Sequence, residues 1–164
     1  MINIYSLRFN ENKLPYLYKE TSVDYMEESR MQTPKAIVDM VNNCFDLEHL
    51  VEEHVIMIAL NAQKHIIGLF NTSHGSLISA DCSPNNIIKR ALLCSAATII
   101  VAHNHPSGDV TPSFDDIQAS HLLQEAGALI GIKLDDFIII GENEYFSFYE
   151  EKLLLECYEE QLRK

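Results

Sequence analysis

The sequence lacks the features that mark several large classes of protein. Its four cysteines form no C-x-x-C pair and lie in apolar surroundings, which predicts buried thiols in a reducing compartment rather than disulfides or metal ligands. Met1 to Lys13 lacks the basic-then-apolar order of a secretory signal, and no run approaches the roughly 20 apolar residues of a membrane helix. We therefore expect a cytoplasmic protein without membrane contact.

Positive charge is also scarce. The chain of 164 residues has 12 Lys+Arg against 24 Asp+Glu, a net charge of −12, and no basic cluster longer than two residues. Duplex DNA binding draws most of its affinity from Lys and Arg that neutralise phosphates, so nucleic-acid binding by this chain alone is disfavoured. A local positive groove around a metal ion leaves that possibility open. By length the chain is one domain, large enough to bury a substantial core.

The most informative segment is residues 103–116, His-Asn-His-Pro-Ser-Gly-Asp-Val-Thr-Pro-Ser-Phe-Asp-Asp. The apolar run 97–102 before it predicts a buried strand. If this strand continues into His103 and His105, alternation points both imidazoles to one face and Asn104 to the other. Asp116 can then add a carboxylate from the start of the next helix. Two histidines and one carboxylate leave a fourth position for water, the pattern of catalytic zinc, and so predict a zinc hydrolase.

A purely structural interpretation exists for part of this segment. Ser113 to Asp116 fits the Ser-x-x-acid pattern of a helix start, so these two residues could simply cap a helix. Capping does not explain the two histidines, and it does not exclude metal ligation by the same carboxylate. The other histidines have no ligand spacing and are expected to be ordinary surface or turn residues: His49, His54, His65, His74 and His121.

The spacing from His103 to Asp116 matches H-x-H-x7-S-x2-D, and the segment therefore resembles the JAB/MPN metalloprotease-like families. The fuller string H-N-H-P-S-G-D-x-T-P-S-x-x-D resembles their RadC-type branch. The resemblance extends from about Thr33 to about Tyr149. It implies an α/β fold, the JAB/MPN-like (cytidine-deaminase-like) mixed sheet flanked by helices, with Zn²⁺ as the cofactor.

The resemblance also implies roles for two further residues. Glu53 falls at the position of the family's glutamate, which acts as general base toward a zinc-activated water, and Ser113 would orient the water or the developing oxyanion. Glu52 is adjacent and could be confused with Glu53. Alternation favours Glu53, which lies an even number of residues from Val55 and Met57, whereas Glu52 would face the opposite side. An exposed glutamate at a strand start remains the alternative.

Two departures from the RadC-type pattern affect the expected function. Asp136 matches the Asp of the family's Asp-His pair, but Phe137 replaces the His. The first thirty-odd residues are too few for the helix-hairpin-helix region that many RadC-type proteins carry. Any DNA affinity which that region confers on its relatives therefore cannot be assumed here.

We divide the chain into an N-terminal extension, 1–32, whose structure the sequence does not predict, and a RadC-like JAB/MPN domain, 33–164. The domain should form two or three layers around a mixed sheet. The expected strands are 54–61, 65–71, 76–80, the metal strand, 133–140 and 145–148, with turns at 61–64 and 73–75. The expected helices are 34–45, 84–96, 115–128 and 149–162.

Three functions from different classes remain open. The first is a zinc metallopeptidase or isopeptidase acting on a peptide or protein, favoured by the complete set His103, His105, Asp116, Ser113 and Glu53. The second is a RadC-like DNA-repair or mobile-element-associated protein that acts as a metal-dependent nuclease. The third is a non-catalytic binding module. A zinc deaminase is excluded, because neither H-x-E nor P-C-x-x-C occurs. Oligomeric state is not predicted.

Overall fold

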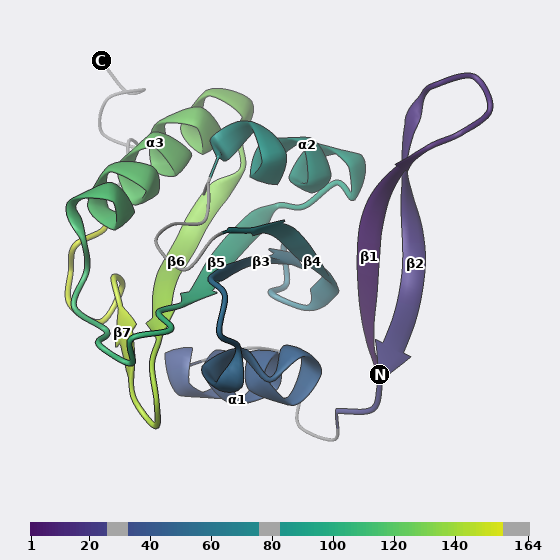
Figure 1. Ribbon diagram of the computed structural model, residues 1–164. Coiled ribbons are helices and arrows are strands. Elements are labelled where there is room, and N and C mark those ends of the chain that lie inside the picture. Colours follow the sequence, from purple (N-terminus) through teal and green to yellow (C-terminus); the bar gives the residue numbers. More distant parts are fainter. Residues whose placement is uncertain (26–32, 76–82, 156–164) are drawn as a thin grey trace, which may run out of the picture.

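A computed structural model describes residues 1–25, 33–75 and 83–155, which form a mixed β-sheet with helices on both faces (Figure 1). In these residues the strands are β1 (Ile2–Phe9), β2 (Pro15–Val23), β3 (His54–Leu60), β4 (Ile66–His74), β5 (Thr98–Asn104), β6 (Lys133–Ile140) and β7 (Tyr145–Ser147). The helices are α1 (Pro34–Phe45), the short 3-10 helix η1 (Leu47–His49), α2 (Pro84–Leu93) and α3 (Phe114–Ile130). The predicted α/β class, with a mixed sheet flanked by helices, is confirmed.

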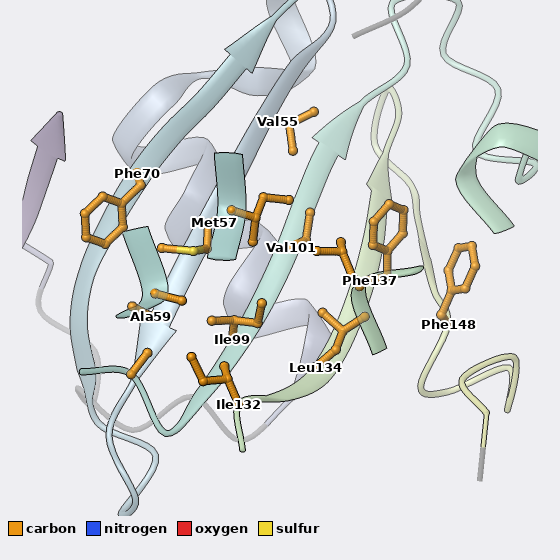
Figure 2. Packing of buried hydrophobic residues seen from close by; sticks show 14 of the residues in the cluster. Val55, Met57, Ala59, Phe70, Ile99, Val101, Ile132, Leu134, Phe137 and Phe148 are labelled. Atoms are coloured by element: carbon orange, nitrogen blue, oxygen red, sulfur yellow. The ribbon is translucent and has the colours of Figure 1, made fainter. Parts of the chain in front are cut away.

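The strand order is β2-β1-β4-β3-β5-β6-β7, so β3 and β5 lie at the centre. Their near-continuous apolar sequences suit strands that are covered on both faces. One face packs on α1, and the other packs under α2 and α3. Figure 2 shows the second of these cores, in which Met57 and Val101 lie among the aromatic rings of Phe70, Phe137 and Phe148. The molecule is therefore built in three layers.

Strand register determines which residues meet at the edge that carries the histidines. β3 and β5 are antiparallel, with Val55 opposite His103, whereas β5 and β6 are parallel, with His103 opposite Ile139. The start of β3 therefore lies beside the ends of β5 and β6. Side chains from segments distant in the sequence are therefore brought together at this end of the strands.

The N-terminal extension contributes two strands to the sheet. β1 and β2 form an antiparallel hairpin, and β1 adds to β4 in parallel through Ile4 and Tyr5. The ring of Tyr5 stacks on Phe70 with centroids 5.6 Å apart, and Gly68 leaves the space that this ring fills. The hairpin stands at the outer edge of the sheet in Figure 1, with β2 as the edge strand.

Several predicted boundaries differ from the structure. β4 continues through His74, so the turn expected at 73–75 is wrong for its first two residues. Helix α2 ends at Leu93, earlier than predicted, because Ser95 adopts a left-handed conformation with φ 55°. The strand expected at 76–80 lies outside the described residues. None of the described helices combines the length and the apolar character required to cross a bilayer.

The predicted helix 149–162 is wrong over residues 149–155, which form turns followed by irregular backbone, and residues 156–162 lie outside the described part of the chain. Two features account for the turns. Lys152 has a left-handed φ of 57°, and the N–H of Leu153 donates to the carbonyl of Phe148 at 2.8 Å, which closes the chain on itself. In addition, the N–H of Tyr149 donates to the carboxylate of Asp136 at 2.9 Å, which holds the start of this segment against β6.

Asp136 is a buried carboxylate that joins β6 to the segment after β7. Its Oδ2 accepts a hydrogen bond from the Ser147 hydroxyl at 2.6 Å, and its Oδ1 accepts the N–H groups of Phe137 and Tyr149. Burial raises the pKa of Asp136 from 3.8 to about 6, although these hydrogen bonds oppose the change. The folded state therefore favours the protonated form more than the unfolded state does.

This raised pKa predicts a pH-dependent stability. The contribution of Asp136 should be fully present below about pH 4 and should be lost as pH rises through 6, where the buried carboxylate ionises. The shift of about two units corresponds to about 3 kcal/mol. Asp136→Asn should remove this part of the decline in the free energy of unfolding between pH 4 and 6.5, measured by urea denaturation. Asp135→Asn is the control and should leave the decline in place; an unchanged decline in Asp136→Asn would contradict the assignment.

Candidate metal centre

The two motif histidines point to the same side of the sheet. His103 lies at the end of β5 and is 1% exposed, and His105 follows directly after the strand. Their Nε2 atoms are 3.2 Å apart, and their ring centroids are 5.0 Å apart. The alternation predicted from the sequence therefore brings the two imidazoles together.

Asp116 completes the group from the first turn of α3. Its Oδ1 lies 3.0 Å from Nε2 of His103, and its Oδ2 lies 3.5 Å from Nε2 of His105. Its Oδ2 also accepts the backbone N–H of Ser113 at 2.7 Å and the Ser113 hydroxyl at 2.6 Å. The N–H of Asp116 donates to the Ser113 hydroxyl in return at 3.1 Å. The same carboxylate thus caps α3 and faces both histidines, and the capping box fixes its direction.

The hydrogen bond on the far side of His105 selects its tautomer. The Nδ1–H of His105 donates to the backbone carbonyl of Asp109 at 2.7 Å. A neutral imidazole protonated on Nδ1 presents the lone pair of Nε2, and this atom faces His103 and Asp116. His105 is therefore oriented as a metal ligand through Nε2. The sequence offers no signal for this contact, because its acceptor is a backbone carbonyl.

The donor set fits a tetrahedral metal ion. One nitrogen from each histidine and one oxygen of Asp116 lie within 4.8 Å of one another. The two nitrogens are 3.2 Å apart, and they lie 3.0 and 3.5 Å from the two different oxygens of the carboxylate. Donors bound at about 2.0–2.1 Å in a tetrahedron are about 3.3 Å apart, so a small ion such as zinc fits without large movement. Three protein donors leave one position open. In the part of the chain that the structure describes, these residues form the one such His/Cys/Asp/Glu group.

The electrostatics of the group also favour a cation. Burial raises the pKa of Asp116, but hydrogen bonds with His103, His105 and Ser113 and the charge of His103 together lower it by more, so it is ionised throughout the physiological range. The pKa of His105 is raised, mainly by its hydrogen bond to Asp116, with a further contribution from the charge of Glu53. Either protons or a metal ion must balance the carboxylate. Metal affinity should therefore fall in acid as protons compete for the histidine nitrogens.

Glu53 lies immediately before β3, on the side of the metal group. It is two residues before Val55, which pairs with His103 at the end of the β3–β5 ladder, so an extension of this register would bring Glu53 near His105. The effect of its carboxylate on the pKa of His105 agrees with this placement. The backbone carbonyl of Glu52 instead accepts a hydrogen bond from the side chain of Asn104 on the opposite face.

Comparison with known proteins agrees with the geometry. The profile of the RadC-like JAB domain matches residues 31–153, about three quarters of the chain. The chain belongs to the RadC-like JAB domain family. The extension before residue 31 is outside the match, although its strands join the same sheet.

Similar sequences come from several bacteria. A UPF0758 protein of Clostridium perfringens is 37% identical over 138 residues, which cover 84% of this chain and 60% of the relative. A UPF0758 protein of Staphylococcus haemolyticus is 37% identical over 128 residues, 78% of this chain and 55% of its own length. One of Moorella thermoacetica is 41% identical over 109 residues, 66% of this chain and 48% of its own length. The chain thus spans about half to three fifths of the length of the curated relatives it matches.

Phe137, which stands where the RadC-type resemblance implies a histidine, packs against the candidate metal centre. Its ring centroid lies 5.3 Å from that of His103 and 5.1 Å from that of Phe148. Because a phenyl ring carries no polar atom, it offers His103 no hydrogen bond. The Nδ1 atom of His103 is buried and has no partner among the described residues. This departure from the RadC-type pattern therefore changes the surroundings of a candidate metal ligand.

The loop between β5 and α3 is held against the end of β6 by close backbone packing. The N–H of His105 donates to the carbonyl of Ile140 at 2.9 Å. A Cβ atom on Gly141 would lie 2.3 Å from the carbonyl oxygen of Gly108 and 2.7 Å from Val110. A side chain at position 141 would therefore displace the loop that carries His105.

Gly141→Ala is accordingly expected to destabilise the domain by about 1–3 kcal/mol and to weaken metal binding, because the loop must move away from β6. Urea denaturation and zinc titration would measure the two effects. Gly131→Ala is the matched control: Gly131 has φ 75°, and a methyl group at this position would meet no atom within 4 Å. This change should cost about 1 kcal/mol and spare zinc affinity. Equal zinc affinity in both variants would show that the loop does not depend on Gly141.

Proposed function

We propose that this protein is a zinc-dependent hydrolase of the JAMM type that cleaves peptide or isopeptide bonds. The observation that carries the proposal is the convergence of His103, His105 and Asp116 at separations suited to a tetrahedral ion, with one position left open. Zinc, when bound, lowers the pKa of water to about 7 and polarises a carbonyl group. Membership of the RadC-like JAB domain family supports the same chemistry.

Glu53 is the proposed general base. Its charge acts on the nearby His105, and in this proposal its carboxylate accepts a proton from the attacking water and later delivers it to the leaving amine. It is not assigned as a metal ligand. The ligand set is already complete with three donors, as in other catalytic zinc sites.

Ser113 is the proposed hydrogen-bond donor to the oxyanion of the amide carbonyl. In the structure its hydroxyl donates to Asp116, so the proposed role requires the hydroxyl to rotate toward the substrate. During this rotation the Asp116 carboxylate would keep the hydrogen bond that it accepts from the backbone N–H of Ser113. Ser113 would therefore serve both to orient Asp116 and to stabilise the reaction.

We expect Ser113→Ala to lower turnover by more than it lowers zinc affinity, since Asp116 keeps its bond from the backbone N–H of residue 113. Loss of the cap should cost about 1 kcal/mol of stability. Steady-state kinetics and zinc titration would separate the effects. The control is Ser107→Ala in the same loop, whose hydroxyl accepts a long 3.4 Å bond from the backbone N–H of Asp109. If zinc affinity fell by as large a factor as turnover, Ser113 would act only by orienting the Asp116 carboxylate and not by contacting the substrate.

The net charge of −12 favours a peptide or protein substrate over nucleic acid. The test uses the full chain loaded with zinc. The candidate substrates, all offered at low salt, are unfolded polypeptide, lysine isopeptides, and single- and double-stranded DNA. Cleavage of peptide or isopeptide bonds that is lost with a chelator and restored by zinc would support the proposal. Metal-dependent DNA cleavage that Glu53→Gln abolishes would overturn it in favour of a nuclease. Absence of hydrolysis across the panel would indicate a binding module.

A further inference from the structure

Asn104 lies between the candidate zinc ligands His103 and His105 in the sequence, but its side chain points to the opposite face of β5. It is 1% exposed, and its side chain points toward the segment that joins η1 to β3. A buried primary amide is costly unless its polar atoms are bonded. The bonds that it makes therefore indicate what it does.

The hydrogen bonds of the Asn104 amide go to backbone groups that surround Glu53. Its Oδ1 accepts the N–H of His54 at 2.8 Å. Its Nδ2 donates to the carbonyl of Glu52 at 3.1 Å and, more weakly, to that of Leu50 at 3.4 Å. The residues immediately before and after Glu53 are thus both tied to one side chain.

Glu53 lies outside the regular ladder of β3, which begins at His54. The pairing of β3 with β5 extends no further than Val55 opposite His103. Beyond that pair, the Asn104 side chain supplies hydrogen bonds between β5 and the backbone on both sides of Glu53. On the other side, the carbonyl of Glu53 accepts the N–H of Gly75 at 2.9 Å.

We propose that Asn104 is a positioning residue. It fixes the backbone position of Glu53 relative to the candidate metal ligands His103 and His105, which lie on either side of Asn104 in the sequence. This inference rests on the proposed role of Glu53 as base. Because His103 and His105 flank Asn104, the Asn104 amide links the segment that carries these two histidines directly to the backbone beside Glu53. Asparagine suits the task, since only an amide side chain of this length offers an acceptor to His54 and donors to Glu52 and Leu50.

The test compares Asn104→Ala with Asn71→Ala. Asn71 is a matched control, because its amide contacts the His54 imidazole at 3.0 Å rather than the backbone beside Glu53. Zinc content and thermal unfolding verify that each variant is folded and loaded. Should Asn104→Ala fail to fold, Asn104→Asp keeps the shape and the acceptor for His54 while removing both donors.

The first readout does not require activity. Amide hydrogen exchange at Gly75, followed by NMR, reports whether the carbonyl of Glu53 stays in place. We expect exchange at Gly75 to accelerate about tenfold or more in Asn104→Ala and to remain unchanged in Asn71→Ala. Unchanged exchange at Gly75 in Asn104→Ala would overturn the proposal, whatever the activity of the protein.

The second readout is a double-mutant cycle with Glu53→Gln on a substrate that the wild type cleaves. Asn104→Ala should lower kcat about 10- to 100-fold with a smaller change in KM, and should have little further effect once Glu53 is Gln. Independent, multiplicative losses would show that Asn104 does not act through Glu53. The wild type could cleave none of the substrates while exchange at Gly75 still accelerates in Asn104→Ala. This result would contradict the proposed hydrolase function but would support the proposal that Asn104 positions the backbone of Glu53.

Discussion

Replacing both His103 and His105 by alanine is expected to reduce the zinc content of the purified protein from about one ion per chain to near zero. The two Nε2 atoms lie 3.2 Å apart and account for two of the three donors, so Asp116 alone would remain. The sheet should still form, because β5 is held by the apolar side chains of both cores rather than by the ion. Elemental analysis and circular dichroism would measure metal content and fold.

His121→Ala is the matched control for this experiment. It removes a histidine from α3, the helix that carries Asp116, but His121 is not part of the metal group. Its zinc content should equal that of the wild type. Full zinc retention in the double variant would rule out the proposed centre. Loss of zinc together with loss of the folded far-UV spectrum would instead show that the ion supports the fold.

The second large effect is expected for Glu53→Gln, which keeps the shape of the side chain and removes its basicity. Zinc should stay bound, since the proposed ligands are His103, His105 and Asp116. Hydrolysis should fall by about two to four orders of magnitude, the usual contribution of a general base. Steady-state kinetics on a cleaved peptide or isopeptide, with parallel metal analysis, would measure both.

Glu52→Gln provides the control at the neighbouring position. The carbonyl of Glu52 is bonded to Asn104 on the opposite face of the sheet, and this bond does not require the Glu52 carboxylate. Activity in Glu52→Gln should therefore remain within about threefold of the wild type. If Glu52→Gln abolished hydrolysis and Glu53→Gln spared it, the assignment along β3 would be wrong by one residue.

The parts predicted correctly are those that depend on local periodicity. Alternation along the apolar strand placed His103 and His105 on one face, and the Ser-x-x-acid pattern predicted the capping box at Ser113 and Asp116. The start of α1 was likewise predicted by its Thr-Pro pair, and Thr33 indeed caps it. These signals involve residues within a few positions of one another, so the sequence carries them directly.

The errors lie where a distant residue overrides a local preference. The acidic, Leu-containing segment after Phe148 has a helical pattern, but Asp136 binds the N–H of Tyr149 and the chain forms turns instead. The sequence did not predict a structure for residues 2–23, because their identity as an edge hairpin depends on pairing with β4, which lies some 60 residues away in sequence. Propensity alone cannot decide between such alternatives.

The sequence by itself determined the α/β class, the two same-facing histidines and the capped carboxylate, because each follows from the period of a strand or the start of a helix. Only the tertiary structure decided what surrounds them. It brought the Asp109 carbonyl to His105, the ring of Phe137 to His103, and Asn104 to the backbone on both sides of Glu53. Strand order and register set these contacts, and alternation specifies the face on which a side chain lies but not the strand that it meets.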